Sequence, residues 1–166
     1  NLKQHKESGG EFYSGWKAAG VGAIAMVILL AGIAIVAFFA GDFSDKTAEF
    51  DTLTYDREVA RFVENENKAV AVFNVIDTSK PDYLIEEFSK GVVLWKENKE
   101  IVERLNLIDN LPKELIEQNA KLLKYCNLRI QHNEIIIKAI REDTDKYVSE
   151  IEKIGLEINE VLKELK

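Results

Sequence analysis

The feature that most constrains this chain is an uncharged stretch over residues 18–41, which lies between Lys17 and Asp42. At about 1.5 Å per residue, a helix of about 24 residues reaches roughly 36 Å, enough to cross a hydrocarbon core of about 30 Å. Backbone amides inside a bilayer must bond within their own segment, and the stretch exceeds the roughly 7 to 15 apolar residues of a cleaved signal peptide. We therefore predict a single-pass transmembrane helix over residues 16–41, after a flexible polar segment over residues 1–15.

Basic residues near the predicted span indicate its orientation. Lys3, Lys6 and Lys17 precede the span, whereas Lys46 alone follows it within about fifteen residues. The side of a span with more lysine and arginine is usually cytoplasmic. We expect a membrane protein with a cytoplasmic N-terminus and a helical domain outside the cytoplasm.

Small residues near the start of the span have the spacing of a helix-packing face. Ala18 pairs with Gly22, and Ala19 pairs with Ala23, in small-xxx-small patterns that allow membrane helices to approach closely. Small residues are also frequent in membrane helices that make no such contact. Both interpretations stay open.

The remaining residues, 42–166, number about 125 and are enough for one domain with its own core. The net charge of −7 comes from interspersed acidic and basic residues, so no basic stripe predicts nucleic-acid binding. Cys126 is the single cysteine, and neither it nor His5 or His132 has metal-ligand spacing. The chain also lacks a phosphate-binding glycine loop, a Gly-x-Ser-x-Gly elbow and a His-Glu-x-x-His motif. We therefore predict no catalytic, cofactor or metal site, and no enzyme.

Three amphipathic helices are expected in this domain, because apolar residues recur at helical spacing over residues 46–76, 81–108 and 112–166. Ser79 and Asp82 have capping-box spacing at the start of the second helix, where Pro81 fits the first turn. Trp95 belongs to the apolar face of that helix, and Lys96 belongs to its polar face. Short connections favour antiparallel neighbours, so the fold class is an all-α, antiparallel three-helix bundle behind the membrane helix.

The third predicted helix has the most regular pattern, because alternating steps of three and four run from Ile116 to Leu165. Poor helix formers at residues 142–145 allow a kink, but the unbroken pattern favours one long, coiled-coil-like helix. Asn119 and Asn133 are expected at the border of the core with access to water. Cys126 is expected to act as a small buried hydrophobe.

A continuous third helix of roughly 54 residues would be about 80 Å long, against about 45 Å for either neighbour. Its last part would project beyond the bundle and carry an exposed apolar stripe. Such a stripe predicts self-association or binding to another helical protein. The predicted partner-binding residues are Tyr147, Ile151, Ile154, Ile158, Val161 and Leu165.

Three segments carry a resemblance to a known family: GVVLWKEN (91–98), LLKYCNLRI (122–130) and KAIREDT (138–144). They resemble the tail that follows the catalytic core in some bacterial rhomboid-family membrane proteins. The resemblance implies an intramembrane serine protease with a Gly-x-Ser-Gly serine and a partner histidine on separate membrane helices. Ser14-Gly15 has Phe12 in place of the first glycine, and the span contains no histidine. The resemblance therefore implies a non-catalytic fragment of a larger membrane protein.

Three functions are compatible with these features. The first is a membrane-anchored helical interaction or scaffold module, held at the lipid bilayer and recruiting a partner through its C-terminal heptads. The second is the accessory C-terminal region of a multi-span membrane protein such as a rhomboid-type protease. The third is a truncated bacterial sensor domain, in which a helical bundle lies between two spans.

Overall fold

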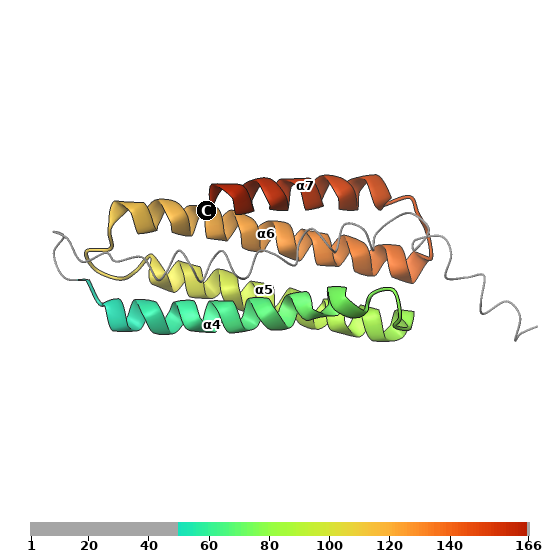
Figure 1. Cartoon of the computed structure of the whole chain (residues 1–166), viewed down its shortest axis with the longest axis horizontal. Helices are drawn as coiled ribbons and strands as arrows, with labels where there is room; N and C mark the ends of the chain where they lie inside the picture. Colours follow the sequence, from blue (N-terminus) through green and yellow to red (C-terminus); the bar gives the residue numbers. More distant parts are fainter. Residues whose placement is uncertain (1–49, 166) are drawn as a thin grey trace, which may run out of the picture.

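The computed structural model describes residues 50–165, which form an antiparallel bundle of four α-helices (Figure 1). The first helix, α4 (Thr52–Val70), continues into a 3-10 helix, η1 (Ala71–Val75). It is followed by α5 (Pro81–Leu105), α6 (Lys113–Glu142) and α7 (Val148–Glu164). Successive helices run in opposite directions, and no strand occurs in this part of the chain (Figure 1). The prediction of an all-α helical bundle is confirmed.

The predicted transmembrane helix lies outside the described residues. So do the polar segment over residues 1–15 and the small-residue pairs Ala18 with Gly22 and Ala19 with Ala23. Among residues 50–165, no helix is both long enough and apolar enough to cross a membrane.

The helix starts follow from local chemistry. The Asp51 carboxylate caps α4 by accepting a hydrogen bond from the Thr54 backbone amide at 2.9 Å. At α5, Pro81 occupies the first turn as predicted, because its fixed φ and missing amide suit that position. Lys80 is the N-cap there and makes no side-chain cap. The capping box expected from Ser79 and Asp82 is not what begins this helix.

The third helix of the prediction is two helices, so the expected three-helix bundle with one long C-terminal helix is wrong. Helix α6 ends at Glu142, and Asp143 takes the left-handed conformation, with φ 45° and ψ 55°. The backbone amide of Thr144 then donates to the carbonyl oxygen of Ala139 at 3.2 Å, a bond typical of a Schellman helix end. Folding back places α7 along α6, so its apolar stripe is buried instead of facing water.

The predicted partner-binding residues are therefore part of the protein's own core, and the expected exposed stripe is wrong. Tyr147 is half-buried at the turn, and the other five side chains are buried: Ile151, Ile154, Ile158, Val161 and Leu165.

The bundle core consists of two clusters of buried side chains, and each cluster draws residues from α5, α6 and α7. Trp95 is 1% exposed, whereas Lys96 is exposed, as the helical pattern predicted. Cys126 is buried as expected. Asn119 and Asn133 are 0% exposed, so their expected place at a hydrated border is wrong. Their amides donate instead to Asn106 Oδ1 at 2.8 Å and to a backbone carbonyl on α5 at 3.4 Å.

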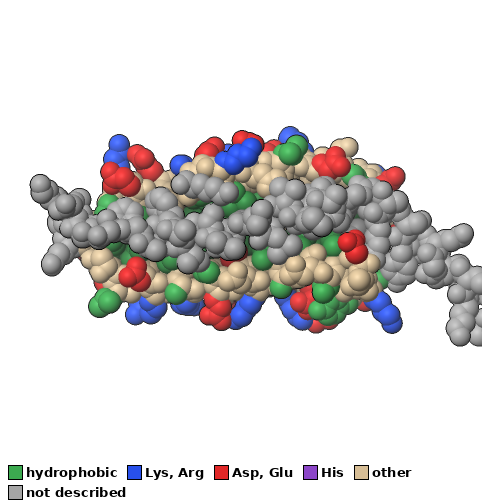
Figure 2. Space-filling view, in the orientation of Figure 1, with side chains coloured by type: hydrophobic (Ala, Val, Ile, Leu, Met, Phe, Trp, Pro, Cys, Tyr) green, Lys and Arg blue, Asp and Glu red, His purple; other side chains and the backbone are tan. Residues whose placement is uncertain are grey.

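The visible surface carries both signs of charge. Figure 2 shows acidic and basic side chains interspersed along the upper and lower edges of the face in view. The described surface also carries oppositely charged neighbours on one helix, such as Lys90 with Glu86 at 2.8 Å and Lys68 with Glu64 at 2.6 Å. Pairs of this kind support an exposed helix surface but add little stability each.

Candidate functional site

The most unusual feature of the described residues is a group of ionisable side chains inside the bundle. Glu66 comes from α4, and Tyr125, Arg129 and His132 come from α6; we call these four residues the polar cluster. Each is no more than 1% exposed. Charged residues are almost never fully buried unless they are paired, so the cluster needs a physical explanation.

A chain of hydrogen bonds joins three of these side chains. The Tyr125 hydroxyl donates to Glu66 Oε1 at 2.6 Å. The same hydroxyl oxygen accepts bonds from Arg129 Nε at 3.1 Å and Nη2 at 3.0 Å. The tyrosine therefore stands between a buried carboxylate and a buried guanidinium, and it links α4 to α6.

Aromatic rings enclose the guanidinium. Arg129 Cζ lies 5.5 Å from the centroid of the Trp95 ring and 5.1 Å from that of the Tyr125 ring. The two rings meet edge to face, with centroids 5.2 Å apart. Ring faces attract a cation, so this setting offsets part of the cost of removing Arg129 from water. His132, the fourth member, stacks against Phe73 with centroids 6.1 Å apart.

Burial dominates the protonation of the cluster. It raises the pKa of the Glu66 carboxyl, while the Tyr125 hydrogen bond and the Arg129 charge act in the opposite direction. Burial also raises the pKa of Tyr125 well above its usual value. For His132, burial and the nearby Arg129 charge lower the pKa to about 3, so its imidazole is neutral at neutral pH.

Two polar atoms of the cluster, Glu66 Oε2 and Arg129 Nη1, have no hydrogen-bond partner within residues 50–165. An unpartnered buried polar atom costs about 1–3 kcal/mol. The cluster is thus held in place by the packing around it, at some cost in stability.

The arrangement favours a structural role over chemistry. All four side chains are shielded from solvent, so a substrate has no access to them in this conformation. Burial raises the pKa of the neighbouring Cys126 thiol, which keeps it in its unreactive protonated form. Among residues 50–165, no three His, Cys, Asp or Glu side chains are placed to hold a metal ion.

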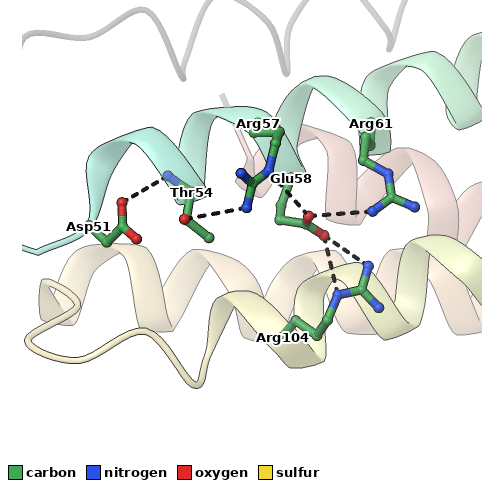
Figure 3. A network of polar contacts seen from close by, with 6 residues as sticks. All are labelled: Asp51, Thr54, Arg57, Glu58, Arg61 and Arg104. Atoms are coloured by element: carbon green, nitrogen blue, oxygen red, sulfur yellow. Dashed lines mark hydrogen bonds and ion pairs between the residues drawn. The ribbon is translucent and has the colours of Figure 1, made fainter.

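A second polar network lies at the surface between α4 and α5 (Figure 3). Arg104 donates to Glu58 Oε2 from Nη2 at 2.8 Å and from Nε at 3.2 Å. Arg61 reaches the other carboxylate oxygen at 3.4 Å. The hydrogen bonds from Arg104 are the main cause that lowers the pKa of Glu58. This network joins two helices but presents no free reactive group.

The sequence carries a signal for the polar cluster, although none of the predictions made from the sequence uses it. Glu66 lies four residues after Phe62 and three before Ala69, both on the buried face of α4. Tyr125, Arg129 and His132 likewise fall on the buried face of α6, between Leu122 and Ile136. A charged residue on the apolar stripe of each of two helices predicts that the two meet inside the core.

The predicted site residues and the polar cluster are separate. The six predicted partner-binding residues lie at the turn and along α7, whereas the cluster is built from α4 and α6. The predicted membrane-packing residues lie outside the described part.

Comparison with known proteins adds no assignment: no family model, no curated protein and no solved structure matches the chain.

Proposed function

We propose that this chain is a membrane-anchored helical interaction or scaffold module without a catalytic site of its own. The observation that carries the proposal is the juxtaposition, in one chain, of an uncharged stretch over residues 18–41 and a bundle whose apolar faces are buried on one another. The uncharged stretch is long enough to span a bilayer. Most of the large apolar side chains of the bundle are buried, which suits a domain that lies outside the bilayer.

The polar cluster supports a scaffold role. Replacing buried charged groups with apolar residues is often neutral or stabilising, so a buried polar cluster is a poor source of stability. It can instead favour one helix register over others. The Glu66–Tyr125–Arg129 chain forms only when α4 and α6 are aligned, which suits a module that must present a fixed shape.

Membrane extraction tests the anchor. We expect the full chain to stay with bacterial membranes after alkaline carbonate washing, and a variant without residues 18–41 to be released. A chain that lacks only residues 2–15 is the matched control and should stay with the membranes. Release of the full chain by carbonate would contradict the anchor.

Thiol labelling tests the orientation. The native Cys126 is buried, so a Lys163→Cys substitution adds the accessible thiol. A membrane-impermeant maleimide should label this variant in intact cells if the helical domain lies outside the cytoplasm. Labelling only after the cells are opened would place the domain inside.

A second candidate function is the accessory tail of a larger, rhomboid-type membrane protein. The specific support is that the three resembling segments gather on two packed helices: residues 91–98 on α5, and residues 122–130 and 138–144 on or just after α6. They include Trp95, Tyr125 and Arg129, which contact one another. Sequencing the reading frame upstream of Asn1 tests this candidate, because it requires several further spans there.

A further inference from the structure

The helix ends at the turn between α6 and α7, but the spacing of apolar residues in the sequence continues unchanged through it. The steps of three and four pass from Ile137 and Ile140 through Thr144 and Tyr147 to Ile151 without a slip. In a helical hairpin, the apolar spacing of the first helix need not continue into the second, because each helix sets its own apolar face. Here a continuous helix would place the stripes of α6 and α7 on one face.

The turn places one non-glycine residue in the left-handed region. Asp143 has φ 45°, in the left-handed region that glycine adopts at no steric cost. Glu142 contacts Lys146 and accepts a bond from the Tyr147 hydroxyl at 2.9 Å. The contact between Glu142 and Lys146 joins residues four apart, in the order that stabilises a helix, so it can persist if the turn straightens.

The main packing partner of α7 is α6. Helix α7 packs along α6, while α4, α5 and α6 pack as a unit of their own (Figure 1). Near the end of α7, Lys121 Nζ donates to the Glu164 carbonyl oxygen at 2.8 Å. Detaching α7 therefore exposes the α6–α7 interface and one side of the core cluster that α7 shares with α4 and α5, but it leaves the α4–α5 and α5–α6 interfaces in place.

We propose that the α6–α7 hairpin can open into one continuous helix, and that a second copy of this chain covers the exposed face by domain swapping. In the swapped dimer, α7 of each copy lies on α6 of the other with the contacts of the closed hairpin. The interface is already built by the chain, so no new surface is needed. The arrangement is two-fold symmetric and closed, which limits it to a dimer.

The second copy is the occupant that the structure favours. A partner that covers the exposed face of α6 must make the contacts that the buried residues of α7 make in the closed hairpin. The α7 helix of a second copy carries the same residues and can make the same contacts. These residues are Ile151, Ile154, Gly155, Ile158, Val161 and Leu162. Short or strained hinge segments are a recognised route to swapping.

Crosslinking between two tagged copies tests the proposal. Full-length chains carrying Cys126→Ala are co-expressed, one copy with Lys121→Cys and the other with Glu164→Cys. They are purified in detergent and treated with a short thiol crosslinker of about the reach of a lysine side chain. An adduct carrying both tags forms if α7 of one copy lies on α6 of the other.

The matched control uses Asn65→Cys on one copy and Glu97→Cys on the other. These residues are also in contact across two helices, with Asn65 Nδ2 3.3 Å from Glu97 Oε2, but both lie outside the exchanged segment. This pair should give only background adduct. Adduct from the test pair should exceed that background.

Residue 143 supplies the second measurement. Asp143→Gly removes the cost of the left-handed conformation and should lower the two-tag adduct by about five-fold. Asp143→Ala keeps that cost and favours a continuous helix, so it should raise the adduct. The proposal would be overturned if the Lys121→Cys and Glu164→Cys pair gave no more adduct than the control pair with Asp143, with Asp143→Gly and with Asp143→Ala. An adduct that is insensitive to residue 143 would also overturn it, because it would indicate contact between closed hairpins.

Discussion

Replacing Gly91 with alanine tests a close approach between α5 and α6. A Cβ atom at this position would lie 2.5 Å from Asn133 Nδ2 and 3.5 Å from the Ala69 carbonyl oxygen. The second distance is an ordinary contact, but the first requires a shift. Asn133 is 0% exposed and donates to the Phe88 carbonyl oxygen at 3.4 Å, so its amide has little room to turn away.

Two effects of opposite sign determine the result. Alanine favours the helix over glycine by about 1 kcal/mol. Against this, overpacking a filled core costs about 1–3 kcal/mol, and an unsatisfied buried amide costs about 1–3 kcal/mol. The bond from Asn133 is long, so its loss belongs at the low end of that range. We expect Gly91→Ala to lower the free energy of unfolding by about 2 kcal/mol.

The double variant separates the steric effect from helix propensity. In an Asn133→Ala background the obstructing amide is absent, so Gly91→Ala should raise the free energy of unfolding by up to about 1 kcal/mol. The two substitutions should then be coupled by about 3 kcal/mol. Urea unfolding of residues 42–166, followed by circular dichroism, measures all four free energies. Finding Gly91→Ala neutral in the parent, or equally destabilising in both backgrounds, would refute the argument.

Three further predictions can be checked by the same unfolding measurement. Trp95→Ala should cost about 3–5 kcal/mol and Lys96→Ala under about 0.5 kcal/mol, because the first side chain is buried and the second is exposed; equal effects would contradict the core assignment. His132 has a folded-state pKa of about 3 against an ordinary value of 6.5, so its contribution to stability is complete above pH 6.5 and is lost as the pH falls toward 3. His132→Phe should therefore reduce the loss of stability between about pH 7.5 and about pH 4.5 by about 2.5 kcal/mol, and an unchanged pH dependence would argue against a buried neutral imidazole. Arg104→Met should cost about 1 kcal/mol or less and less still in high salt, because Arg104 is partly exposed beside Glu58; a cost that salt does not change would indicate a packing role.

The sequence alone predicted the helices and most of the buried surface. Apolar residues at helical spacing and a proline at the start of α5 predicted an all-α bundle with Trp95 and Cys126 inside. These features depend on residues near one another in the chain, and the physics of helix propensity and amphipathic faces is local.

The direction of the chain after Glu142 was decided only by the tertiary structure. A stripe in steps of three and four shows which face of a helix is apolar, but it is the same for a continuous helix and for a hairpin. Folding back wins because α7 then buries its stripe on α6, which offsets the strain at Asp143. The sequence shows which residue stands at the turn, but it does not show that the surface of α6 is available to bury α7 and offset the strain.

The polar cluster also depended on tertiary contacts. Glu66 and Tyr125 are 59 residues apart in the chain, and each alone is a polar residue on a mainly apolar face. Only the packing of α4 and α6 on α5 brings the carboxylate, the hydroxyl and the Arg129 guanidinium into one hydrogen-bonded chain. The sequence by itself determined where the helices form and which faces they bury, because those follow from neighbours along the chain. The tertiary structure decided which buried groups meet, because burial of a charge is tolerable only where another helix supplies its partner.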